Sequence, residues 1–299
     1  MQKQKKIWFN NKFIDWDDAN VHVLTHSLHY GSAVFEGLRA YRTEDKTAVF
    51  RLNEHLERFF ASANVLNIKI PFSKTLLKEA ILKLIKINNL KECYIRPIVF
   101  YGYGEMGIYP KDLPVNVAIA AWPWDAYLNK EIVKAKISKY IRLHPKSCPM
   151  SFKISGYYVN SIFATLEAKE FGFDEAILLD YKGCVAEGPG ENIFMVKKNK
   201  LFTPSLGSIL PGITRDSIIK IAQDLKISVK EKNIKVEEIK SADEAFFAGT
   251  AIEICPISQI DNKKIKDGKI GPTTLEIKEY FERIVRGREK KYLKWLTFV

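Results

Sequence analysis

A single lysine, Lys153, stands in a run of residues from Ser151 to Tyr158 that is otherwise uncharged. An amine in an apolar setting loses part of its charged form, because burial disfavours the ammonium ion, and it then attacks carbonyl groups more readily. The same run also fits an ordinary lysine whose amine reaches solvent from a loop. Lys153 alone therefore decides nothing, and partners elsewhere in the chain must support a chemical role.

Two carboxylates, Glu187 and Glu191, flank the turn Gly188-Pro189-Gly190 and precede an apolar run. Paired carboxylates also suit glycoside hydrolysis, and the segment equally fits a polar hairpin turn. We favour an interpretation in which one carboxylate lies in the interior and the other at the turn. The glycines would then let the backbone approach a flat ligand closely.

Two further segments can present backbone N–H groups to an anion. Residues 210–214 (LPGIT) come directly before a predicted helix, whose first N–H groups have no partner inside the helix. Residues 247–251 (FAGTA) read as a buried strand that ends in small residues and can aim N–H groups in the same way. Pyridoxal phosphate requires a lysine for its aldehyde, an acid for its ring nitrogen and N–H donors for its phosphate. The second half of the chain supplies this set, which favours a pyridoxal-phosphate site over the alternatives.

Three histidines, His22, His26 and His29, are spaced four and three positions apart, which resembles a set of metal ligands on a helix. Val21 and Val23 alternate around His22 as in a strand, however, so the three side chains would not share a face. No run of cysteines or carboxylates accompanies them. We therefore expect ordinary polar or packing histidines and no metal site.

The composition limits the class of protein. The chain has 299 residues, of which 46% are apolar and 27% charged, as in globular proteins with one large or two moderate domains. The net charge of +12 comes with scattered lysines and no nucleic-acid-binding motif, so we expect a surface that attracts anionic small molecules and no nucleic-acid partner. We expect no membrane span, no signal peptide and a cytoplasmic location. The cysteines are far apart in the sequence and read as free thiols: Cys93, Cys148, Cys184 and Cys255.

The elements that must position these groups divide the chain in two. Strand-like runs surround two helices, with Asn53 and Ser73 as candidate N-caps, and predict a small domain over residues 1–122. Residues 123–130 are predicted to be a linker because Pro123 interrupts the pattern. Residues 131–299 are predicted to form a larger domain. The fold class predicted from this pattern is α+β.

The motifs are similar to those of branched-chain amino acid aminotransferases, which are pyridoxal-phosphate enzymes of fold type IV. The resemblance extends in order over nearly the whole chain and includes Glu187, 34 positions after Lys153. It implies a smaller N-terminal α/β domain and a larger C-terminal domain with a mixed, barrel-like sheet. The segments that carry the resemblance are 30–41, 94–97, 187–194, 210–216 and 249–251.

The resemblance also implies how the cofactor is held. Lys153 would form a Schiff base with pyridoxal phosphate and then move a proton between the substrate α-carbon and the cofactor. Glu187 would pair with the ring nitrogen, and Tyr158 would bond the phenolic oxygen of the ring. The phosphate would be bound by Arg58 and, largely through backbone N–H groups, by Ile213, Thr214 and Thr250.

The implied reaction transfers the amino group of L-leucine, L-isoleucine or L-valine to 2-oxoglutarate, giving branched 2-oxo acids and L-glutamate. An apolar pocket edged by one arginine would suit both half-reactions, and it would lie between the domains. Since family members are dimers or larger, we expect a homodimer or homohexamer. The pocket would be lined by Tyr30, Phe35, Gly37, Tyr127 and Gly190, and carboxylates would be bound by Tyr94, Arg96, Thr250 and Ala251.

Two other families share this fold, the D-amino-acid aminotransferases and the aminodeoxychorismate lyases. The turn at 187–192 together with Tyr94-Ile95-Arg96 is more similar to the branched-chain group. A basic binding module without catalysis is the alternative from a different class. The sequence departs from the family beside the lysine, where larger residues replace small ones and an asparagine, and this affects the expected shape of the pocket: Phe152, Ile154 and Tyr157.

Overall fold

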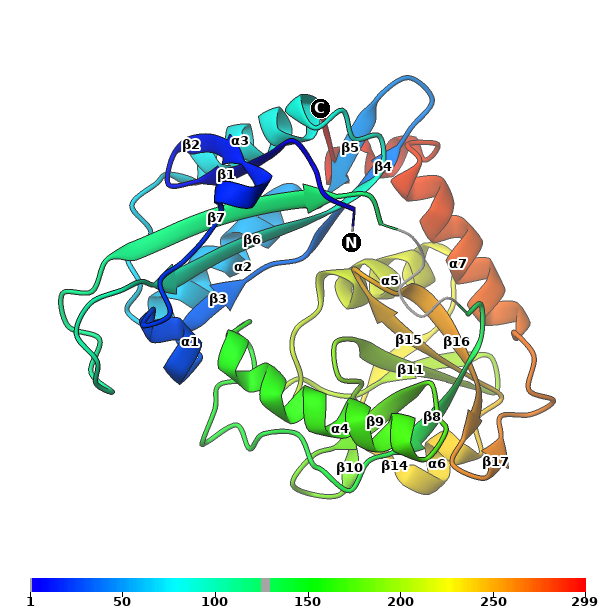
Figure 1. Ribbon diagram of the computed structural model, residues 1–299. Helices are drawn as coiled ribbons and strands as arrows, with labels where there is room; N and C mark the ends of the chain where they lie inside the picture. Colours follow the sequence, from blue (N-terminus) through cyan, green and yellow to red (C-terminus); the bar gives the residue numbers. More distant parts are fainter. Residues whose placement is uncertain (1, 125–129) are drawn as a thin grey trace. The chain divides into compact units, whose positions relative to one another are not determined.

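The computed structural model describes residues 2–124 and 130–299 (Figure 1). These residues form two compact units. The first comprises the chain up to residue 124 together with Phe152–Gly156 and Ile284–Val299, and the second comprises residues 130–151 and Tyr157–Arg283. The prediction from sequence treated each domain as one continuous segment. The structure instead groups two later segments with the N-terminal residues, because both pair with strands of the first unit. Most of the predicted linker 123–130 lies outside the described residues.

The first unit is built on an antiparallel sheet of eight strands in the order β18-β5-β4-β6-β7-β1-β2, with β3 paired to β6. Helices α2 and α3 pack on this sheet against β3, β1 and β7. The elements are β1 (Lys6–Phe9), β2 (Lys12–Asp15), η1 (Trp16–Asp18), α1 (His26–Tyr30), β3 (Ala33–Phe35), β4 (Leu38–Arg42), β5 (Thr47–Phe50), α2 (Leu52–Val65), α3 (Lys74–Ile87), β6 (Cys93–Tyr101), β7 (Val115–Trp122), η3 (Lys290–Trp295) and β18 (Leu296–Phe298).

Local sequence explains two boundaries in this unit. Asn10 and Asn11 both adopt positive φ, 44° and 66°, which suits a two-residue hairpin between β1 and β2. The Ser73 side chain accepts a hydrogen bond of 3.1 Å from the N–H of Leu76 and caps α3, so the cap predicted there is confirmed.

The cap predicted at Asn53 is wrong. Helix α2 begins at Leu52, and its N-cap is Arg51 with φ of 50°. The backbone N–H of Arg51 donates to the carbonyl of Trp295 at 2.7 Å, and its guanidinium lies 4.8 Å from the centre of the Trp295 ring. A contact with the far end of the chain therefore sets the start of this helix.

The second unit is built on a mixed sheet of ten strands in the order β13-β12-β11-β15-β16-β8-β9-β10-β14, with β17 paired to β16. The sheet curls as Figure 1 shows, in agreement with the predicted barrel-like sheet. Parallel pairs join β12 to β13, β16 to β8 and β8 to β9. The elements are β8 (Val133–Ile137), α4 (Tyr158–Glu170), β9 (Glu175–Leu179), β10 (Cys184–Glu187), β11 (Asn192–Lys197), β12 (Lys200–Thr203), α5 (Ile213–Asp224), β13 (Val229–Glu231), β14 (Ile234–Lys235), α6 (Val236–Lys240), β15 (Glu244–Gly249), β16 (Glu253–Ile260), β17 (Lys263–Lys264) and α7 (Pro272–Val285), with η2 (Ser155–Tyr157) before α4.

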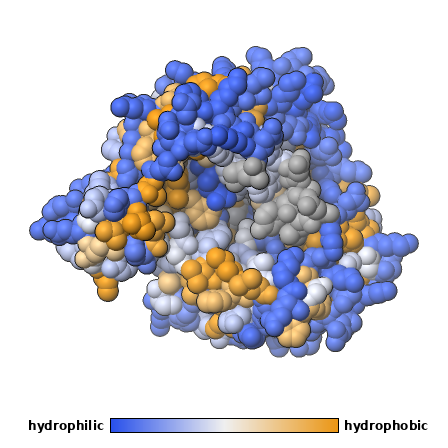
Figure 2. Space-filling view, in the orientation of Figure 1, coloured by the Kyte–Doolittle hydropathy of each residue, from blue (hydrophilic) through white to orange (hydrophobic). Residues whose placement is uncertain are grey.

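Side chains from most of these strands meet in one apolar cluster, which includes Val133, Ile177, Ile193 and Phe247. Helix α4 packs on β9, where small residues let the helix approach the sheet. The opposite side of α4 is apolar and exposed, and Figure 2 shows this apolar patch. The patch consists of Val159, Ile162, Phe163 and Leu166. Among the described residues, no helix is both long and apolar enough to cross a membrane.

Candidate active site

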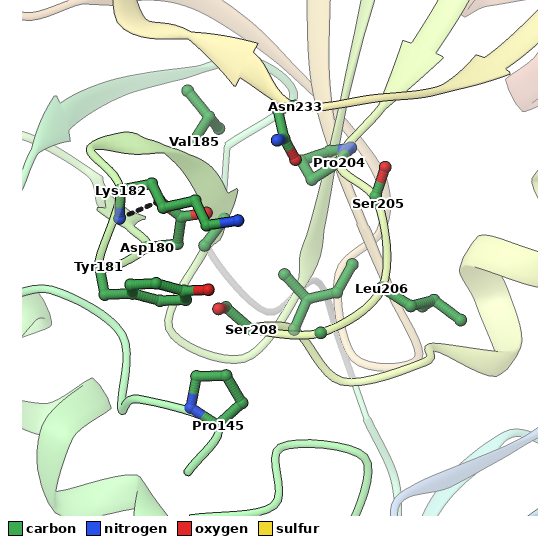
Figure 3. Close-up of a pocket in the computed structure, with 13 residues that line it drawn as sticks. Pro145, Asp180, Tyr181, Lys182, Val185, Pro204, Ser205, Leu206, Ser208 and Asn233 are labelled. Atoms are coloured by element: carbon green, nitrogen blue, oxygen red, sulfur yellow. Dashed lines mark hydrogen bonds between the residues drawn. The ribbon is translucent and has the colours of Figure 1, made fainter. Parts of the chain in front are cut away.

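A pocket of about 100 Å³ lies in the second unit, between the β9–β10 hairpin and the loop at 204–209 (Figure 3). Asp180, Tyr181 and Lys182 line one side of it, and Ser205 and Leu206 line the other. None of the residues predicted to bind cofactor or substrate borders this pocket. The predicted site residues gather elsewhere, in one group within each unit.

In the first unit, the segment that carries Lys153 is held by backbone contacts to β3 and α2. The Lys153 carbonyl accepts the N–H of Phe35 at 3.3 Å, and the Lys153 N–H donates to Ser62 Oγ at 3.0 Å. Ile154 forms a β-bridge with Val34. The half-buried Lys153 side chain places Nζ 4.8 Å from the centre of the Phe35 ring. The amine therefore lies against an aromatic face at a position that the backbone fixes.

The same segment depends on a close approach of two glycines. The Gly156 N–H donates to the Gly31 carbonyl at 3.2 Å. Gly31 has φ of 64°, and a Cβ on it would stand 2.7 Å from the Cα of Gly156. A larger residue at position 31 would be strained and would push the lysine segment away.

Glu36 is a completely buried carboxylate beside this segment. Its Oε1 accepts a hydrogen bond from Arg58 Nε at 2.6 Å, and its Oε2 accepts one from Arg58 Nη2 at 3.0 Å and one from the His55 ring at 2.7 Å. Burial alone raises the pKa of Glu36, but the charge of Arg58 and the contacts with His55 outweigh it and hold the pKa well below its usual range. Burial lowers the pKa of His55. The imidazole is therefore neutral, and its Nδ1–H donates to Glu36.

Arg96 lies between two aromatic rings. Its guanidinium carbon is 4.6 Å from the centre of the Phe35 ring and 5.2 Å from that of Tyr94, and Nη2 donates to the Tyr94 hydroxyl at 3.3 Å. The buried Nε has no hydrogen-bond acceptor among the described residues. A Cβ on Gly37 would stand 1.9 Å from the Tyr94 hydroxyl, so glycine is needed here to leave room for that group. Arg96 thus retains a donor that an anion could use.

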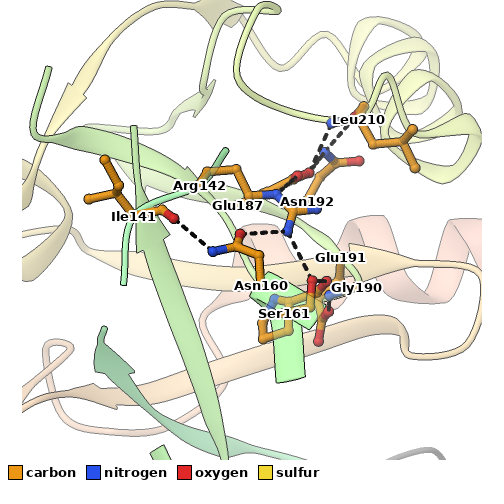
Figure 4. Close-up of polar contacts among 10 residues, drawn as sticks. Ile141, Arg142, Asn160, Ser161, Glu187, Gly190, Glu191, Asn192 and Leu210 are labelled. Carbon is orange, nitrogen blue, oxygen red and sulfur yellow. Dashed lines mark hydrogen bonds and ion pairs between the residues drawn. The ribbon is translucent and has the colours of Figure 1, made fainter. Parts of the chain in front are cut away.

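In the second unit, Glu187 ends β10 and is almost completely buried. Its Oε1 accepts from Arg142 Nε at 2.7 Å, and its Oε2 accepts from Asn192 Nδ2 at 3.2 Å and from the Leu210 N–H at 3.1 Å (Figure 4). Arg142 is fixed in turn, because its Nη1 donates to Ser161 Oγ at 2.9 Å. These donors stabilise the negative charge of Glu187 and fix the direction of the carboxylate.

The two predicted anion-binding segments also lie in this unit. Gly212 precedes α5, no side chain in the described part of the protein caps that helix, and Thr214 is buried in its first turn. A Cβ on Gly212 would stand 2.0 Å from Asn192 Oδ1, so the start of α5 lies directly against a partner of Glu187. The second segment begins within the end of β15, and a Cβ on Gly249 would stand 3.2 Å from the Cβ of Glu191. The turn that carries Glu187 therefore contacts both segments.

The predicted residues are thus placed as follows. In the first unit Lys153 and Arg96 lie on the ring of Phe35, and Tyr94 contacts both Arg96 and Gly37. Arg58 is held by Glu36 in the same unit. Tyr30 is half-exposed on α1, next to the His26 ring. Tyr127 lies outside the described residues. The second unit contains Tyr158 at the start of α4, and also Glu187, Gly190, Ile213, Thr214, Thr250 and Ala251.

The histidines lie differently from the prediction. Residues 21–24 form no strand, and His26 and His29 lie together on α1. Both ring nitrogens of His26 are hydrogen-bonded, Nδ1 to Ser32 Oγ and Nε2 to the Gly107 carbonyl, each at 2.7 Å. Within residues 2–124 and 130–299, no cluster of side chains has the make-up of a metal site.

Comparison with known proteins identifies the family. Residues 33–260 match the family model described as amino-transferase class IV. Over 297 residues the chain is 43% identical to the branched-chain-amino-acid aminotransferase of Pseudomonas aeruginosa, in an alignment that covers 98% of this chain and 97% of that protein. The chain belongs to the branched-chain-amino-acid aminotransferase family.

Two solved structures of this family have the same fold. The branched-chain aminotransferase of the thermophilic archaeon Thermoproteus uzoniensis, determined with norvaline, is 43% identical with a TM-score of 0.95, and the match covers 99% of each chain. The branched-chain amino acid aminotransferase of Escherichia coli is 41% identical with a TM-score of 0.96, and the match covers 98% of this chain and 99% of that one. The predicted family and fold class are therefore confirmed.

Four residues of this branched-chain-amino-acid aminotransferase family member support the candidate site although the sequence analysis assigned them no role. Glu36 and Asn192 stand inside motifs of apolar and small residues, where a polar residue signals a buried partner. His55 and Arg142 carry no such local signal. They lie 19 and 45 positions from the carboxylates that they contact.

The buried pairing of Glu36 predicts a stability effect that depends on pH. Because the pKa of Glu36 is lowered in the folded protein, its contribution is complete above the usual value of 4.5 and is lost as the pH falls below it. Replacing Glu36→Gln leaves Arg58 with an incomplete partner and should lower the free energy of unfolding by about 3 kcal/mol at about pH 7. The difference from the wild type should shrink at about pH 3.5. Urea denaturation at both pH values measures it.

A matched control is Glu54→Gln, since Glu54 is partly exposed and pairs with Arg51 at 2.6 Å on the same helix. This change should cost less than about 1 kcal/mol. If the difference in unfolding free energy between the wild type and Glu36→Gln were the same at both pH values, the charge of Glu36 would not be what stabilises the first unit.

Proposed function

We propose that the chain catalyses the pyridoxal-phosphate-dependent transfer of the amino group from L-leucine, L-isoleucine or L-valine to 2-oxoglutarate, which yields branched 2-oxo acids and L-glutamate. The observation that carries this proposal is the placement of the Lys153 amine on the Phe35 ring, with the Arg96 guanidinium on the same ring. One aromatic side chain thus contacts a group able to attack a carbonyl and a group able to bind a carboxylate. The family relationship supports the same reaction.

The residues present fit pyridoxal phosphate. Glu187 is a carboxylate of fixed direction, which suits a protonated ring nitrogen. The start of α5 has no side-chain cap and carries the buried Thr214, which suits a phosphate. Arg58 is a second phosphate ligand in this proposal, with its orientation fixed by Glu36. Bound pyridoxal phosphate supplies an aldehyde that condenses with amines and a protonated ring that withdraws electrons from the substrate α-carbon.

Each residue then has a defined task. Lys153 Nζ takes the proton from the substrate α-carbon and returns it, and its place on the Phe35 ring keeps water from one side of the amine. Glu187 would keep a proton on the ring nitrogen, because Arg142 and Asn192 hold the carboxylate in place. The Tyr158 hydroxyl would bond the phenolic oxygen of the ring, and the phosphate would be held by backbone N–H groups of Ile213, Thr214 and Thr250.

The same site must accept an apolar side chain in one half-reaction and a second carboxylate in the other. Phe35 and Tyr94 offer aromatic surface to a branched side chain, while Arg96 lies between them with an unused buried donor. A carboxylate that reached Arg96 would pair with that donor and with the charge. The substrate α-carboxylate is assigned to the backbone at Thr250 and Ala251, and Tyr30, Gly37, Tyr127 and Gly190 complete the proposed lining.

The first test is the visible absorption spectrum of the purified protein loaded with pyridoxal phosphate. L-Leucine should convert the band of the lysine-bound cofactor to that of the amine form, and 2-oxoglutarate should restore it. Borohydride should fix the cofactor on Lys153, and Lys153→Ala should abolish turnover and the fixation. An absorption band that changed only on addition of a D-amino acid would contradict the proposed substrate class. The absence of any cofactor band would contradict the proposal that the protein binds pyridoxal phosphate.

Arg96 gives a second test, on substrate choice. Arg96→Ala should reduce kcat/KM for glutamate and 2-oxoglutarate about tenfold or more beyond any loss for leucine, because only the former bring a second carboxylate. Arg42→Ala, which removes an exposed arginine from β4 of the same sheet, controls for the loss of an arginine. Equal losses for leucine and glutamate would contradict the role given to Arg96.

The chain is further proposed to act as a homodimer or homohexamer in the cytoplasm. The apolar patch on α4 supports self-association, since burying it removes apolar area from water (Figure 2). All four cysteines are free thiols, which supports a reducing compartment. Sedimentation should give a mass of at least two chains, and Leu166→Glu should lower it. A wild-type protein that sedimented as a single chain would refute this part of the proposal.

A further inference from the structure

The second carboxylate of the turn, Glu191, has no task in the proposed reaction, yet it is almost completely buried. So is Glu175, the first residue of β9, which pairs with the strand that carries Glu187. The Glu191 carboxyl accepts a hydrogen bond from the N–H of Gly190 (Figure 4) and lies within hydrogen-bonding reach of the Glu175 carboxyl. Two buried acids therefore meet directly beneath the turn.

Such a contact is stable only if a proton lies between the two groups. Ionised carboxylates are acceptors only, so two of them repel each other and cannot form a hydrogen bond. In agreement, Glu191 Oε1 is buried and receives no hydrogen bond from an N–H or O–H donor in the described residues. A proton on one of the acids supplies the missing donor.

The surroundings indicate which acid holds that proton. Burial raises the pKa of Glu175, but its carboxyl accepts the N–H of Ala176 at 3.0 Å, and this bond together with Lys169 and Thr165 of α4 acts to lower that pKa. Among the residues that the structure describes, Glu191 accepts a hydrogen bond only from the Gly190 N–H, and it is near the negative charge of Glu187. Burial and the charge of Glu175 raise the pKa of Glu191 well above its usual value.

The other titratable groups near the pair do not change this assignment. Burial raises the pKa of the Cys255 thiol of β16 to about 12, so it stays neutral, and the charge of Lys278 of α7 acts to lower that pKa. The negative charge therefore belongs on Glu175, and the proton belongs on Glu191.

The protonated side chain lies where two turns meet. A Cβ on Gly188 would stand 3.0 Å from Glu191 Cγ, and a Cβ on Gly249 would stand 3.2 Å from Glu191 Cβ. The first turn carries Glu187, and the second leads into Thr250 and Ala251. Any movement of Glu191 would therefore shift backbone on both sides.

We propose that Glu191 is a positioning residue that works as a neutral acid. It donates a hydrogen bond to the Glu175 carboxylate while it accepts one from Gly190, and so it holds the turn that carries Glu187 against the turn that carries Thr250 and Ala251. The expected effect on cofactor binding and catalysis rests on the proposed function. The presence of the proton on Glu191 and its effect on stability do not depend on that function.

Two substitutions separate the proton from the shape of the side chain. In Glu191→Gln, the amide oxygen can accept from Gly190 and the amide nitrogen can donate to Glu175, which reproduces the neutral acid. Glu191→Leu has a similar size but leaves both partners unsatisfied. We expect Glu191→Leu to weaken pyridoxal phosphate binding about tenfold or more, with Glu191→Gln within about threefold of the wild type. Titration of the apoprotein with pyridoxal phosphate measures both.

Infrared spectroscopy detects the proton directly and needs no activity. The wild type minus Glu191→Gln difference spectrum near neutral pH should contain the C=O band of a protonated carboxyl. Glu167→Gln is the control, because Glu167 is a buried carboxylate that accepts from the Ser138 hydroxyl and the Lys139 N–H. Its difference spectrum should show the loss of an ionised carboxylate instead. Absence of the protonated band in the Glu191 pair of spectra would overturn the proposal.

The pH dependence of stability gives an independent readout. Because the pKa of Glu191 is raised in the folded protein, the folded state keeps its proton to higher pH than the unfolded chain. The unfolding free energy of the wild type, relative to Glu191→Gln, should therefore fall as the pH rises above the usual value of 4.5. An unfolding free energy, relative to Glu191→Gln, that stayed constant or increased with pH would overturn the proposal. If Glu191→Leu did not fold, the infrared and pH measurements on Glu191→Gln would still decide it.

Failure of this inference differs from failure of the proposed function. A wild-type protein that bound no pyridoxal phosphate but showed the protonated carboxyl band would refute the proposed reaction and support the proton on Glu191. A wild-type protein that exchanged amino groups with leucine but lacked the band would support the reaction and refute the proton on Glu191.

Discussion

Both units bury carboxylates, and the candidate site depends on how each of these charges is compensated. An ionised carboxylate away from water is costly unless fixed donors or a cation surround it. Glu36 obtains them from Arg58 and His55, and Glu187 obtains them from Arg142, Asn192 and a backbone N–H. Both donors to Glu36 belong to α2, whereas the donors to Glu187 come from separate segments, so each buried acid also fixes the position of its neighbouring elements within its unit.

Signals in the sequence were enough for the family, the fold class and the cap of α3 at Ser73. The hairpin at Asn10-Asn11 and the cap at Ser73 follow from residues in the turn itself. The start of α2 could not be predicted in this way, because Arg51 is held by Trp295 near the other end of the chain. The partners of the buried acids were missed for the same reason. Their chemistry depends on contacts between distant residues, which leave no periodic pattern.

The large residues beside Lys153 that depart from the family pattern have structural roles. Ile154 is buried and bridges to Val34, so its side chain belongs to the core of the first unit. Burial and, to a smaller extent, the neighbouring Cys148 raise the pKa of the Tyr157 hydroxyl to about 12. These residues therefore stabilise the segment that follows the lysine, and the Lys153 amine keeps its contact with Phe35.

The first unit is also closed by segments that the ribosome makes much later. Lys153 hydrogen-bonds to Ser62, 91 positions earlier, and β18 at the C-terminus completes the sheet beside β5. Such long-range contacts are slow to form because the loop that they close must first be ordered. During synthesis, β5 has no β18 partner on one edge until the C-terminal residues have been made. The Lys153 amine therefore takes its final place late, and a fragment cut at the predicted boundary after residue 122 would contain neither Lys153 nor a complete sheet.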